Sequence, residues 1–460
     1  MHRRGFVSGA AVLAAFAGRR ALAAGAPAVA PEDLRSAARE AWLYGLPLIE
    51  AARLRTAAIG AAPQAGQPGF NSFSHQRALA GPDFQEFSAP EPDLLYSSAW
   101  IHVGAGPAKI SVPPTGGRYF SLAVYDLYGN VLETVEGLKA AKDGHDVTVI
   151  GPPSRIGLPG YTAPMPRIPA LHRVIYTRHR WVWAVARTHV EGDHDLAAAH
   201  QLQDRLQVSA KPAETQVRPA PSVARSAPWS DYFFAVQQLI DENPPIRDDE
   251  GFFQRIAPAQ LGMYGGFETA RFADAELPAV AQGVAEAQTL ASQAPAEPRV
   301  GSWLCPKADL GQYGQDFLYR AQTALVAPGS LKPQAVTPLR ALAPGGARAF
   351  AGGKAYRLTL PNALPASGLW SLSLYAQLPD GRLFLSPNPI GRGFVGAWTP
   401  GLRRAPGGAV EVAIGHQDPG GPANWLPAPA SGAFALILRL YAPTEPALAR
   451  RWSPPPVEPT

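Results

Sequence analysis

The segment Phe434-Ala-Leu-Ile-Leu-Arg-Leu-Tyr441, which follows the turn residues Ser431 and Gly432, decides the fold class of this chain. It is short, apolar and rich in branched and aromatic side chains, a composition that favours a β-strand over a helix. The preceding stretch, His416-Gln-Asp-Pro-Gly-Gly-Pro-Ala-Asn-Trp-Leu-Pro-Ala-Pro429, is dense in proline and glycine and predicts an inter-strand loop. The carboxy-terminal part of the chain is therefore expected to consist of strands and turns.

Strand-like segments occur in two blocks of the chain. They are Lys109–Val112, Tyr119–Tyr125, Asp146–Ile150 and Trp181–Arg187 in the first block, and Ala355–Leu360, Leu369–Tyr375, Val410–Ile414 and Phe434–Tyr441 in the second. Tyr119–Tyr125 and Trp181–Arg187 lack a polar face, so each is expected to be covered on both sides. Because no regular strand and helix alternation supplies the crossovers of a parallel sheet, we expect antiparallel pairing in both blocks.

Helical patterns precede the first block and separate the two. The first helix, Pro31–Arg55, contains Pro47, which should kink or divide it. Further helices are expected over Asp195–Leu206, Trp229–Asp241, Asp249–Ile256, Leu277–Ser292 and Gln312–Leu325, and residues 207–228 suggest a loop or linker.

The sequence therefore predicts a mainly β protein with helical segments (α+β), in which two antiparallel β-sandwich or jelly-roll-like domains are joined and fronted by helices. Residues 24–210 would form the amino-terminal helix and first sandwich, residues 211–330 a linker and helical middle section, and residues 331–460 the second sandwich.

Several of these segments resemble a bacterial family whose two halves are called domains of unknown function 1254 and 1214. Asp93–Trp100 and Thr115–Asp126 fit the amino-terminal half, while Trp398–Leu402 and His416–Tyr441 fit the carboxy-terminal half. The resemblance implies two β-sandwich-like domains joined and fronted by helices. It implies no activity, because the family itself carries no settled one.

The first residues have the pattern of an export signal. Arg3 and Arg4 are followed by an uncharged stretch to Gly18 and by the small-residue cleavage site Ala21-Leu-Ala23. This predicts a twin-arginine signal peptide over residues 1–23, which engages the twin-arginine translocation machinery and leads to a periplasmic or secreted protein. Cleavage after Ala23 removes four arginines and no acid, so the formal net charge falls from +5 to +1.

Charge and hydropathy limit the classes of partner. A nearly neutral mature chain without a basic run gives little support for nucleic-acid binding, which depends on neutralising many phosphates. No later apolar run approaches the roughly 18 residues that suggest a membrane span, so we expect no stable span in the mature form. The single cysteine, Cys305, excludes an intrachain disulfide.

Local catalytic and metal-binding motifs are absent from the sequence. It contains no Gly-x-Ser-x-Gly, His-Glu-x-x-His, Walker loop or cysteine pair. His189, His194 and His200 form the densest histidine cluster, but their spacing points them in different directions, so no metal site is expected there. Asp193 is better interpreted as a helix cap. The sequence leaves any cofactor undetermined.

Asp93 and Tyr96 are the candidate catalytic residues of the first half. In family relatives this loop resembles Asn-x-Asp-Thr-Leu-Tyr-Ser, and here Glu91 replaces the asparagine and Leu94 the threonine. The carboxylate and phenol are fit for proton transfer or for hydrogen bonding to hydroxyl groups. Alternatively, Asp93 bonds its own turn and Tyr96 packs. Asp126, which ends a strand, is a candidate ligand-binding carboxylate or a turn residue.

The loops of the second half bring together polar and aromatic side chains. His416 is a candidate acid or base, and the candidate ligand-binding residues are Arg392, Trp398, Asp418, Asn424 and Trp425. Aromatic rings beside amide, carboxylate and guanidinium groups suit a carbohydrate or a carboxylate-bearing ligand. The glycine and proline residues around position 420 also permit a purely structural role for this loop.

The leading functional hypothesis is the binding or processing of a small polar molecule, hydroxylated or acidic, at the junction of the two halves. In an enzyme, a hydrolase or lyase, Asp93 or His416 would act as base, Tyr96 as proton donor, and Arg392 would hold an anionic group. The alternative is a non-catalytic carbohydrate-binding or envelope-interaction protein that uses Trp398 and Trp425 as stacking platforms. A cofactor-dependent oxidoreductase is the third hypothesis. Convergence of these residues in one pocket would favour catalysis.

Overall fold

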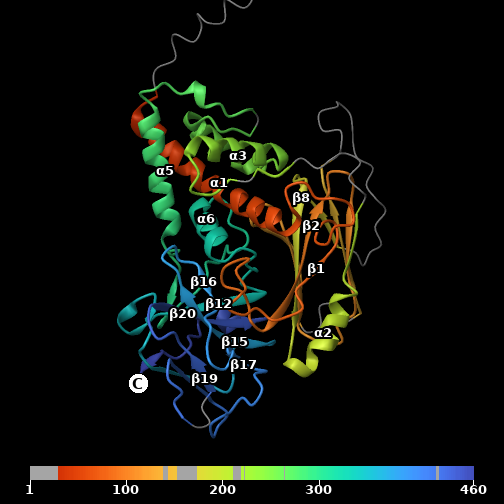
Figure 1. Ribbon diagram of the computed structural model, residues 1–460, viewed down its shortest axis with the longest axis vertical. Coiled ribbons are helices and arrows are strands. Elements are labelled where there is room, and N and C mark those ends of the chain that lie inside the picture. Colours follow the sequence, from red (N-terminus) through yellow and green to blue (C-terminus); the bar gives the residue numbers. More distant parts are fainter. Residues whose placement is uncertain are drawn as a thin grey trace, which may run out of the picture.

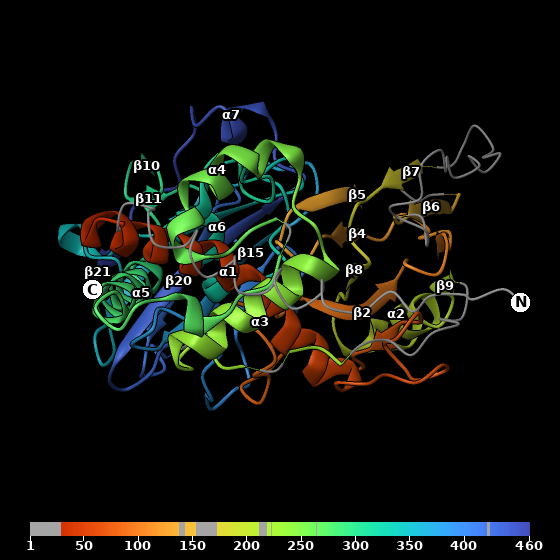
Figure 2. The ribbon, with the colours of Figure 1, turned by 90° about the horizontal axis from the view of Figure 1, so that it is seen from above.

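The computed structural model describes residues 29–137, 143–152, 173–210, 219–221, 223–263, 265–420 and 424–460. The predicted signal peptide lies outside these residues. Helices form a layer at one end of the molecule, and two groups of sheets lie below and beside it, one from each half of the chain (Figure 1). In the view from above, the N-terminal sheets lie on one side and the C-terminal sheets on the other (Figure 2).

The N-terminal half contains a five-stranded and a four-stranded sheet. The first has the order β1 (Ser74–His75), β2 (Leu94–His102), β8 (Trp181–His189), β4 (Phe120–Tyr125) and β5 (Val131–Gly137). The second has the order β7 (Arg173–Tyr176), β6 (His145–Ile150), β3 (Ala108–Val112) and β9 (Gln207–Ala210).

Strands β4 and β8 are buried along their whole length, as predicted from their apolar sequences. One face of β8, with Val182 and Ala184, shares an apolar core with the four-stranded sheet. The other face, with Trp181 and Trp183, belongs to the core of the helical layer. Successive strand residues point to opposite faces, so a strand covered on both sides has no position for solvated side chains.

The C-terminal half repeats this division into a larger and a smaller sheet. The larger has the order β10 (Arg299–Val300), β11 (Trp303–Leu304), β12 (Val336–Ala341), β20 (Ala433–Tyr441), β15 (Trp370–Gln377) and β16 (Leu383–Phe384); β13 (Phe350–Ala351) pairs with β20 and β17 (Phe394–Gly396) with β15. The smaller has the order β19 (Asn424–Pro427), β18 (Val410–Gly415), β14 (Tyr356–Leu360) and β21 (Glu458–Pro459). Both sheets contribute to one apolar core.

The helical layer combines the first helix with the middle of the chain. It contains α1 (Pro31–Ile59), α3 (Trp229–Glu242), α4 (Glu250–Arg255), α5 (Leu277–Ser292) and α6 (Phe317–Val326). Pro47 lies inside α1 without dividing it. A β-carbon at Gly283 would lie 2.1 Å from the Arg35 carbonyl oxygen, so glycine at this position lets α5 approach α1 closely.

Short helices complete the fold. They are α2 (Leu196–Gln203), α7 (Glu445–Leu448) and single 3₁₀ turns at Asp193–Asp195, Arg247–Asp249, Ala257–Ala259, Thr269–Arg271 and Pro344–Gly346. Within the described residues, no helix combines the length and the apolar character that crossing a membrane requires.

The structure differs from the sequence-based expectations in several places. Residues 424–427, expected in a loop, form strand β19, and Tyr96, also expected in a loop, lies on β2. The pairs β6–β7 and β18–β19 are parallel, so the sheets are not purely antiparallel. Residues 207–210, expected in a loop, form strand β9 beside β3. Strands β10 and β11 join the C-terminal sheet although they precede residue 331. Asp193 lies within a 3₁₀ turn and makes no capping hydrogen bond, because the chain enters that turn from Gly192.

Candidate functional site

A buried network of charged side chains lies where the two halves meet. At its centre is Glu91, which is 8% exposed and lies just before β2. Its Oε2 atom accepts hydrogen bonds from Arg187 Nε at 2.9 Å and from the Tyr96 hydroxyl at 2.5 Å. Its Oε1 atom lies 4.0 Å from Arg439 Nε. Glu91 therefore joins an arginine of the N-terminal half to one of the C-terminal half.

Strand pairing brings these side chains together. Tyr96 on β2 lies directly opposite Arg187 on β8. On β20, Arg439 shares a face with Ala435, Ile437 and Tyr441, because alternate residues of a strand point the same way. The opposite face of β20 is built into the apolar core of the C-terminal sheets. The face that carries Arg439 is thus turned toward the N-terminal half.

The arginines are held firmly, yet one donor of Arg187 is unused. Its Nη2 donates to the Gly329 carbonyl at 2.7 Å, whereas its buried Nη1 has no acceptor among the described residues. Arg439 donates to the Tyr375 hydroxyl at 2.7 Å and to the Ala89 carbonyl at 2.8 Å. A buried donor without an acceptor is costly, so Arg187 Nη1 marks a place where an acceptor from outside the chain fits.

The protonation states follow from burial and from the arginines. Burial alone would raise the pKa of Glu91, but the charges of Arg187 and Arg439 outweigh it and hold this pKa below its ordinary value. Burial raises the pKa of Tyr96 well above its ordinary value, so the phenol stays protonated. At neutral pH the pair is therefore a carboxylate that accepts a hydrogen bond from a neutral phenol.

Asp93 lies two residues beyond Glu91 and is 3% exposed. Its Oδ1 atom accepts a hydrogen bond from the Tyr441 hydroxyl at 3.1 Å. Burial raises the pKa of Asp93 to about 6, although nearby Arg439 acts in the opposite direction. A carboxyl group with such a pKa can take up and release a proton close to neutral pH.

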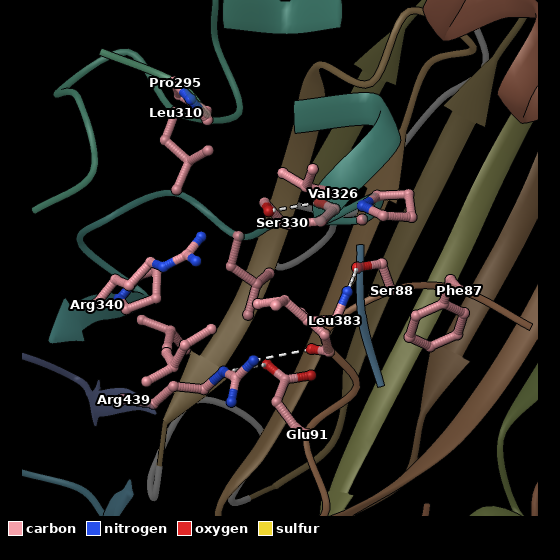
Figure 3. Close-up of a pocket in the computed structure, with 18 of the residues that line it drawn as sticks. Phe87, Ser88, Glu91, Pro295, Leu310, Val326, Ser330, Arg340, Leu383 and Arg439 are labelled. Atoms are coloured by element: carbon pink, nitrogen blue, oxygen red, sulfur yellow. Dashed lines mark hydrogen bonds and ion pairs between the residues drawn. The ribbon is translucent and has the colours of Figure 1, made fainter. Parts of the chain in front are cut away.

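A cavity of about 130 Å³, which we call the inner cavity, lies beside Glu91 and between the two halves. Figure 3 shows Arg340 and Arg439, from β12 and β20, beside this cavity, with Glu91 next to Arg439 and Ser88 on the far side. Its charged lining residues are Arg187, Arg340, Arg348, Arg439, Glu91 and Glu297. The lining thus contains four arginines and two glutamates, an excess of positively charged side chains.

The positive excess of the inner cavity is greater than this count suggests. Burial raises the pKa of Glu297 to about 7, so this carboxyl group is ionised only in part at neutral pH. Arg340 Nε is buried and has no acceptor among the described residues. Burial, and then the neighbouring charge of Arg348, lowers the pKa of Arg340 from its ordinary value. An anion in the cavity would relieve this repulsion.

A second cavity, the outer cleft, is lined in part by Asp93 and has a volume of about 380 Å³. Asp93 and His189 contribute from the first half, and Arg392 and Trp398 from the second. Burial, followed by the charge of Arg118, lowers the pKa of His189 to about 4, so its imidazole is neutral at pH 7. The Trp398 ring is 48% exposed and lies 6.2 Å from the His189 ring.

The structure thus brings together some of the sequence-predicted site residues. Asp93, Arg392 and Trp398 share the outer cleft, whereas Tyr96 lines the inner cavity instead. The Arg392 amide donates to the Asn388 side chain at 2.8 Å and its guanidinium donates to the Trp425 carbonyl at 3.0 Å.

The other predicted site residues line neither cavity. His416 and Asp418 are exposed, and Asp418 accepts a hydrogen bond from the Gly420 amide of its own loop at 2.9 Å. Asn424 is buried and bonds the backbone of Arg403 and Glu411.

Two more candidate residues have structural partners. Trp425 is 7% exposed and donates to the Gly415 carbonyl, so its ring presents no open face for stacking. Asp126 holds its turn by accepting from the amides of Tyr128 and Asn130, both at 2.9 Å. Within the described ranges, no group of three or more His, Cys, Asp or Glu side chains is arranged to hold a metal ion.

Sequence reasoning missed Arg187, Arg439 and Arg340. A signal was available for the first two, because each is the only charged side chain in an otherwise apolar segment, Trp181–Arg187 and Phe434–Tyr441. A charged residue in a strand covered on both sides must be paired or functional. Arg340 has no comparable signal in its surroundings.

Comparison with known proteins supports the two-part organisation. A family model described as protein of unknown function (DUF1254) matches residues 70–210, and another, protein of unknown function (DUF1214), matches residues 337–445. No curated protein matches the chain.

Solved structures of similar fold exist. The crystal structure of the VPA0106 protein from Vibrio parahaemolyticus has 18% identity and a TM-score of 0.64, and the match covers 93% of this chain and 100% of that one. That of a putative uncharacterized protein from Burkholderia cenocepacia has 14% identity and a TM-score of 0.40 over 93% of each chain. The first likeness indicates a shared fold.

Proposed function

We propose that this chain, which combines a DUF1254 domain with a DUF1214 domain, binds a small carboxylic acid in the inner cavity between its two halves. The observation that carries the proposal is the unused Nη1 donor of Arg187, buried at a cavity with four arginines in its lining. Guanidinium groups are the side chains best suited to carboxylates, because their donors match the two oxygens.

The size of the cavity limits the ligand. A cavity of about 150 Å³ holds benzene, which has six non-hydrogen atoms. The inner cavity, at about 130 Å³, suits a molecule of similar size, such as a short carboxylic acid or hydroxy acid. It is too small for a sugar chain.

The contacts of the inner cavity favour binding over chemistry. The Tyr96 proton is directed at Glu91, and Glu91 is held as a carboxylate by two arginines. Neither group is free to exchange a proton with a ligand. A hydrolase or lyase reaction would use Asp93, which lines the outer cleft and has a pKa of about 6.

The proposal includes the location and the architecture of the protein. Export by the twin-arginine route would place ligand binding in the periplasm. We also infer that each half is a β-sandwich, because two sheets contribute to one apolar core in each.

The test is a thermal-shift screen of small carboxylic acids against the mature chain, with the corresponding amides as ligand controls. An acid at a hundred times its dissociation constant should stabilise the protein by about 2.7 kcal/mol. Arg187→Lys keeps the charge beside Glu91 but loses the planar guanidinium with its paired donors. It should raise the dissociation constant of the acid found in the screen by about tenfold or more.

Arg357→Lys is the matched control, because Arg357 also lies on a strand but its side chain is 48% exposed and pairs only loosely with Glu458. Binding that is equal in Arg187→Lys and Arg357→Lys would contradict the proposal. So would a screen in which acids and amides stabilise alike.

A carbohydrate ligand is the second candidate, and the exposed Trp398 ring at the outer cleft favours it. Aromatic faces stack on sugar rings, and Arg392 and Asp93 would bond the hydroxyl groups. In that case sugars rather than small acids stabilise the protein, Trp398→Ala abolishes the effect, and Arg187→Lys leaves it unchanged.

A further inference from the structure

A third pocket lies away from the inner cavity and the outer cleft. It has a volume of about 410 Å³ and forms where the turn after β4 meets α6 and the start of α4. Its acidic and basic lining residues are Asp126, His179, Asp249 and Arg320. We call it the helix-side pocket.

Arg320 is the unusual member of this pocket. It is 3% exposed, and both its Nε and its Nη2 atoms are buried without an acceptor among the described residues. These two donors lie on the same edge of the guanidinium group, the edge that binds both oxygens of a carboxylate side by side. The complete carboxylate-binding edge of a buried arginine is therefore unused.

The surroundings of Arg320 stabilise its charge without supplying an acceptor. Its guanidinium carbon lies 4.6 Å from the centre of the Tyr44 ring, 4.8 Å from that of Phe317 and 5.2 Å from that of Tyr128. Such contacts attract the cation through the ring faces. In the part of the chain that the structure describes, Arg320 makes no ion pair within 4 Å.

The two acids of the pocket are occupied by other partners. Asp249 accepts from the Tyr44 hydroxyl at 2.9 Å and from the Gln315 side chain at 3.0 Å. Asp126 accepts from two backbone amides of its turn and from the Asn130 side chain. Neither carboxylate is thus available as the missing acceptor for Arg320.

His179 is a second buried group with an unused polar atom. It is 4% exposed, and its Nε2 lies 3.7 Å from Asp126 Oδ2, while its Nδ1 has no partner in the described residues. Burial lowers the pKa of His179, so the imidazole is neutral at pH 7. With its proton on Nε2 toward Asp126, the ring presents Nδ1 as an acceptor.

His179 and Arg320 border the same aromatic ring. The Tyr128 ring centre lies 5.5 Å from that of His179 and 5.2 Å from the guanidinium carbon of Arg320. His179 and Arg320 therefore lie against the same residue of the pocket lining.

We propose that the helix-side pocket is a second ligand site, which binds a small hydroxycarboxylate. The carboxylate receives the Nε and Nη2 donors of Arg320, and the hydroxyl group donates to Nδ1 of His179. This site goes beyond the function proposed for the inner cavity, since it shares no lining residue with it. Two buried groups with opposite hydrogen-bonding needs, one a double donor and one an acceptor, define the ligand class.

The test uses glycolate, the smallest hydroxycarboxylate, and acetate, which lacks the hydroxyl group. Equilibrium binding of each radiolabelled acid is measured with the mature wild-type protein, Arg320→Lys, His179→Phe and Arg187→Lys. Arg320→Lys keeps a cation among the rings but removes the two-donor edge, and should weaken glycolate at this site by about tenfold to a hundredfold. His179→Phe should remove the preference for glycolate over acetate while acetate still binds.

Arg187→Lys separates this site from the inner cavity. This variant should leave the affinity of the helix-side pocket for glycolate unchanged, even where it weakens binding in the inner cavity. If Arg320→Lys and wild type bind glycolate at the same number of sites with the same affinity, the proposal is overturned. A crystal of the wild-type protein soaked in glycolate gives a decision that does not depend on any variant: the ligand on the Arg320 edge supports the site, and an empty pocket refutes it.

Discussion

Replacing Asp93 by Asn should stabilise the protein at neutral pH and have no such effect in acid. Asp93 is 3% exposed, and burial raises its pKa from 3.8 to about 6. Between these values the folded protein holds the proton more tightly than the unfolded chain does. The free energy of unfolding therefore falls as the pH rises through this window and stays lower above pH 6.

The size of the effect follows from the shift. About two pKa units correspond to about 3 kcal/mol, at 1.36 kcal/mol for each unit. Asparagine has nearly the same shape, and its amide oxygen can keep the hydrogen bond from Tyr441. Asp93→Asn should therefore exceed the wild type by about 3 kcal/mol at pH 7.5 and should match it near pH 4.

The assay is urea unfolding followed by tryptophan fluorescence at pH values from 4 to 8. A change of midpoint at constant slope reports stability. The control is Asp418→Asn, because the Asp418 carboxylate is exposed and accepts a hydrogen bond from the Gly420 amide of its own loop. A stability difference that does not change with pH, or a loss of stability in Asp93→Asn at pH 7.5, would refute the reasoning and would show that Arg439 compensates the charge of Asp93 fully.

Three further predictions follow from the site and from the amino terminus. Glu91→Gln should lower the free energy of unfolding by about 3–5 kcal/mol at pH 7, because it leaves two buried arginines without their anion. Since the pKa of Glu91 is lowered in the folded protein, this difference from the wild type should shrink as the pH falls below 4.5. Gly329→Ala should cost about 1–3 kcal/mol in urea unfolding, because Gly329 has φ +73° and a β-carbon there would lie 3.1 Å from the Trp183 ring. Joint replacement of Arg3 and Arg4 by Lys should leave precursor in the cytoplasm, as fractionation would detect.

Specific outcomes would contradict these predictions. Gly314→Ala is the matched control for the glycine substitution, because Gly314 has φ +52° but a β-carbon there meets no atom within 4 Å. Equal losses in the two variants would remove the argument from contact with Trp183. A Glu91→Gln protein as stable as wild type would mean that the two arginines do not need this carboxylate. Normal periplasmic appearance of the double lysine variant would contradict export by the twin-arginine route.

Local sequence patterns predicted the long helices and the longer apolar strands of the fold. The helix predicted over Leu277–Ser292 is observed with these bounds, and Trp181–Arg187 lies within β8. Such segments can be predicted because the spacing of their apolar residues indicates which face is buried. Strand β9 was missed, since Gln207–Ala210 has no apolar run and forms a strand only because β3 offers it an edge.

The candidate site was predicted in part. Asp93 was identified from the sequence, and Arg392, His416, Asp418 and Trp425 were expected to approach it; of these four, Arg392 lines the outer cleft with Asp93, and Trp398 lines it as well. His416 and Trp425 were chosen from residue types that suit ligands, but residue type does not reveal whether a loop faces the junction or solvent. His416 is exposed in the loop after β18, whereas Trp425 is buried because it lies on β19, which pairs with β18.

By itself, the sequence determined the long helices, the apolar strands and the division into two halves, because these depend on neighbours along the chain. Only the tertiary structure decided that Glu91 lies between Arg187 and Arg439, which are 252 positions apart in the chain. Packing between elements distant in sequence decides which face of β20 meets the N-terminal half. It also decides which donors of Arg187 and Arg320 remain unused. Burial and hydrogen-bond satisfaction are properties of that packing, and no local pattern of residues encodes them.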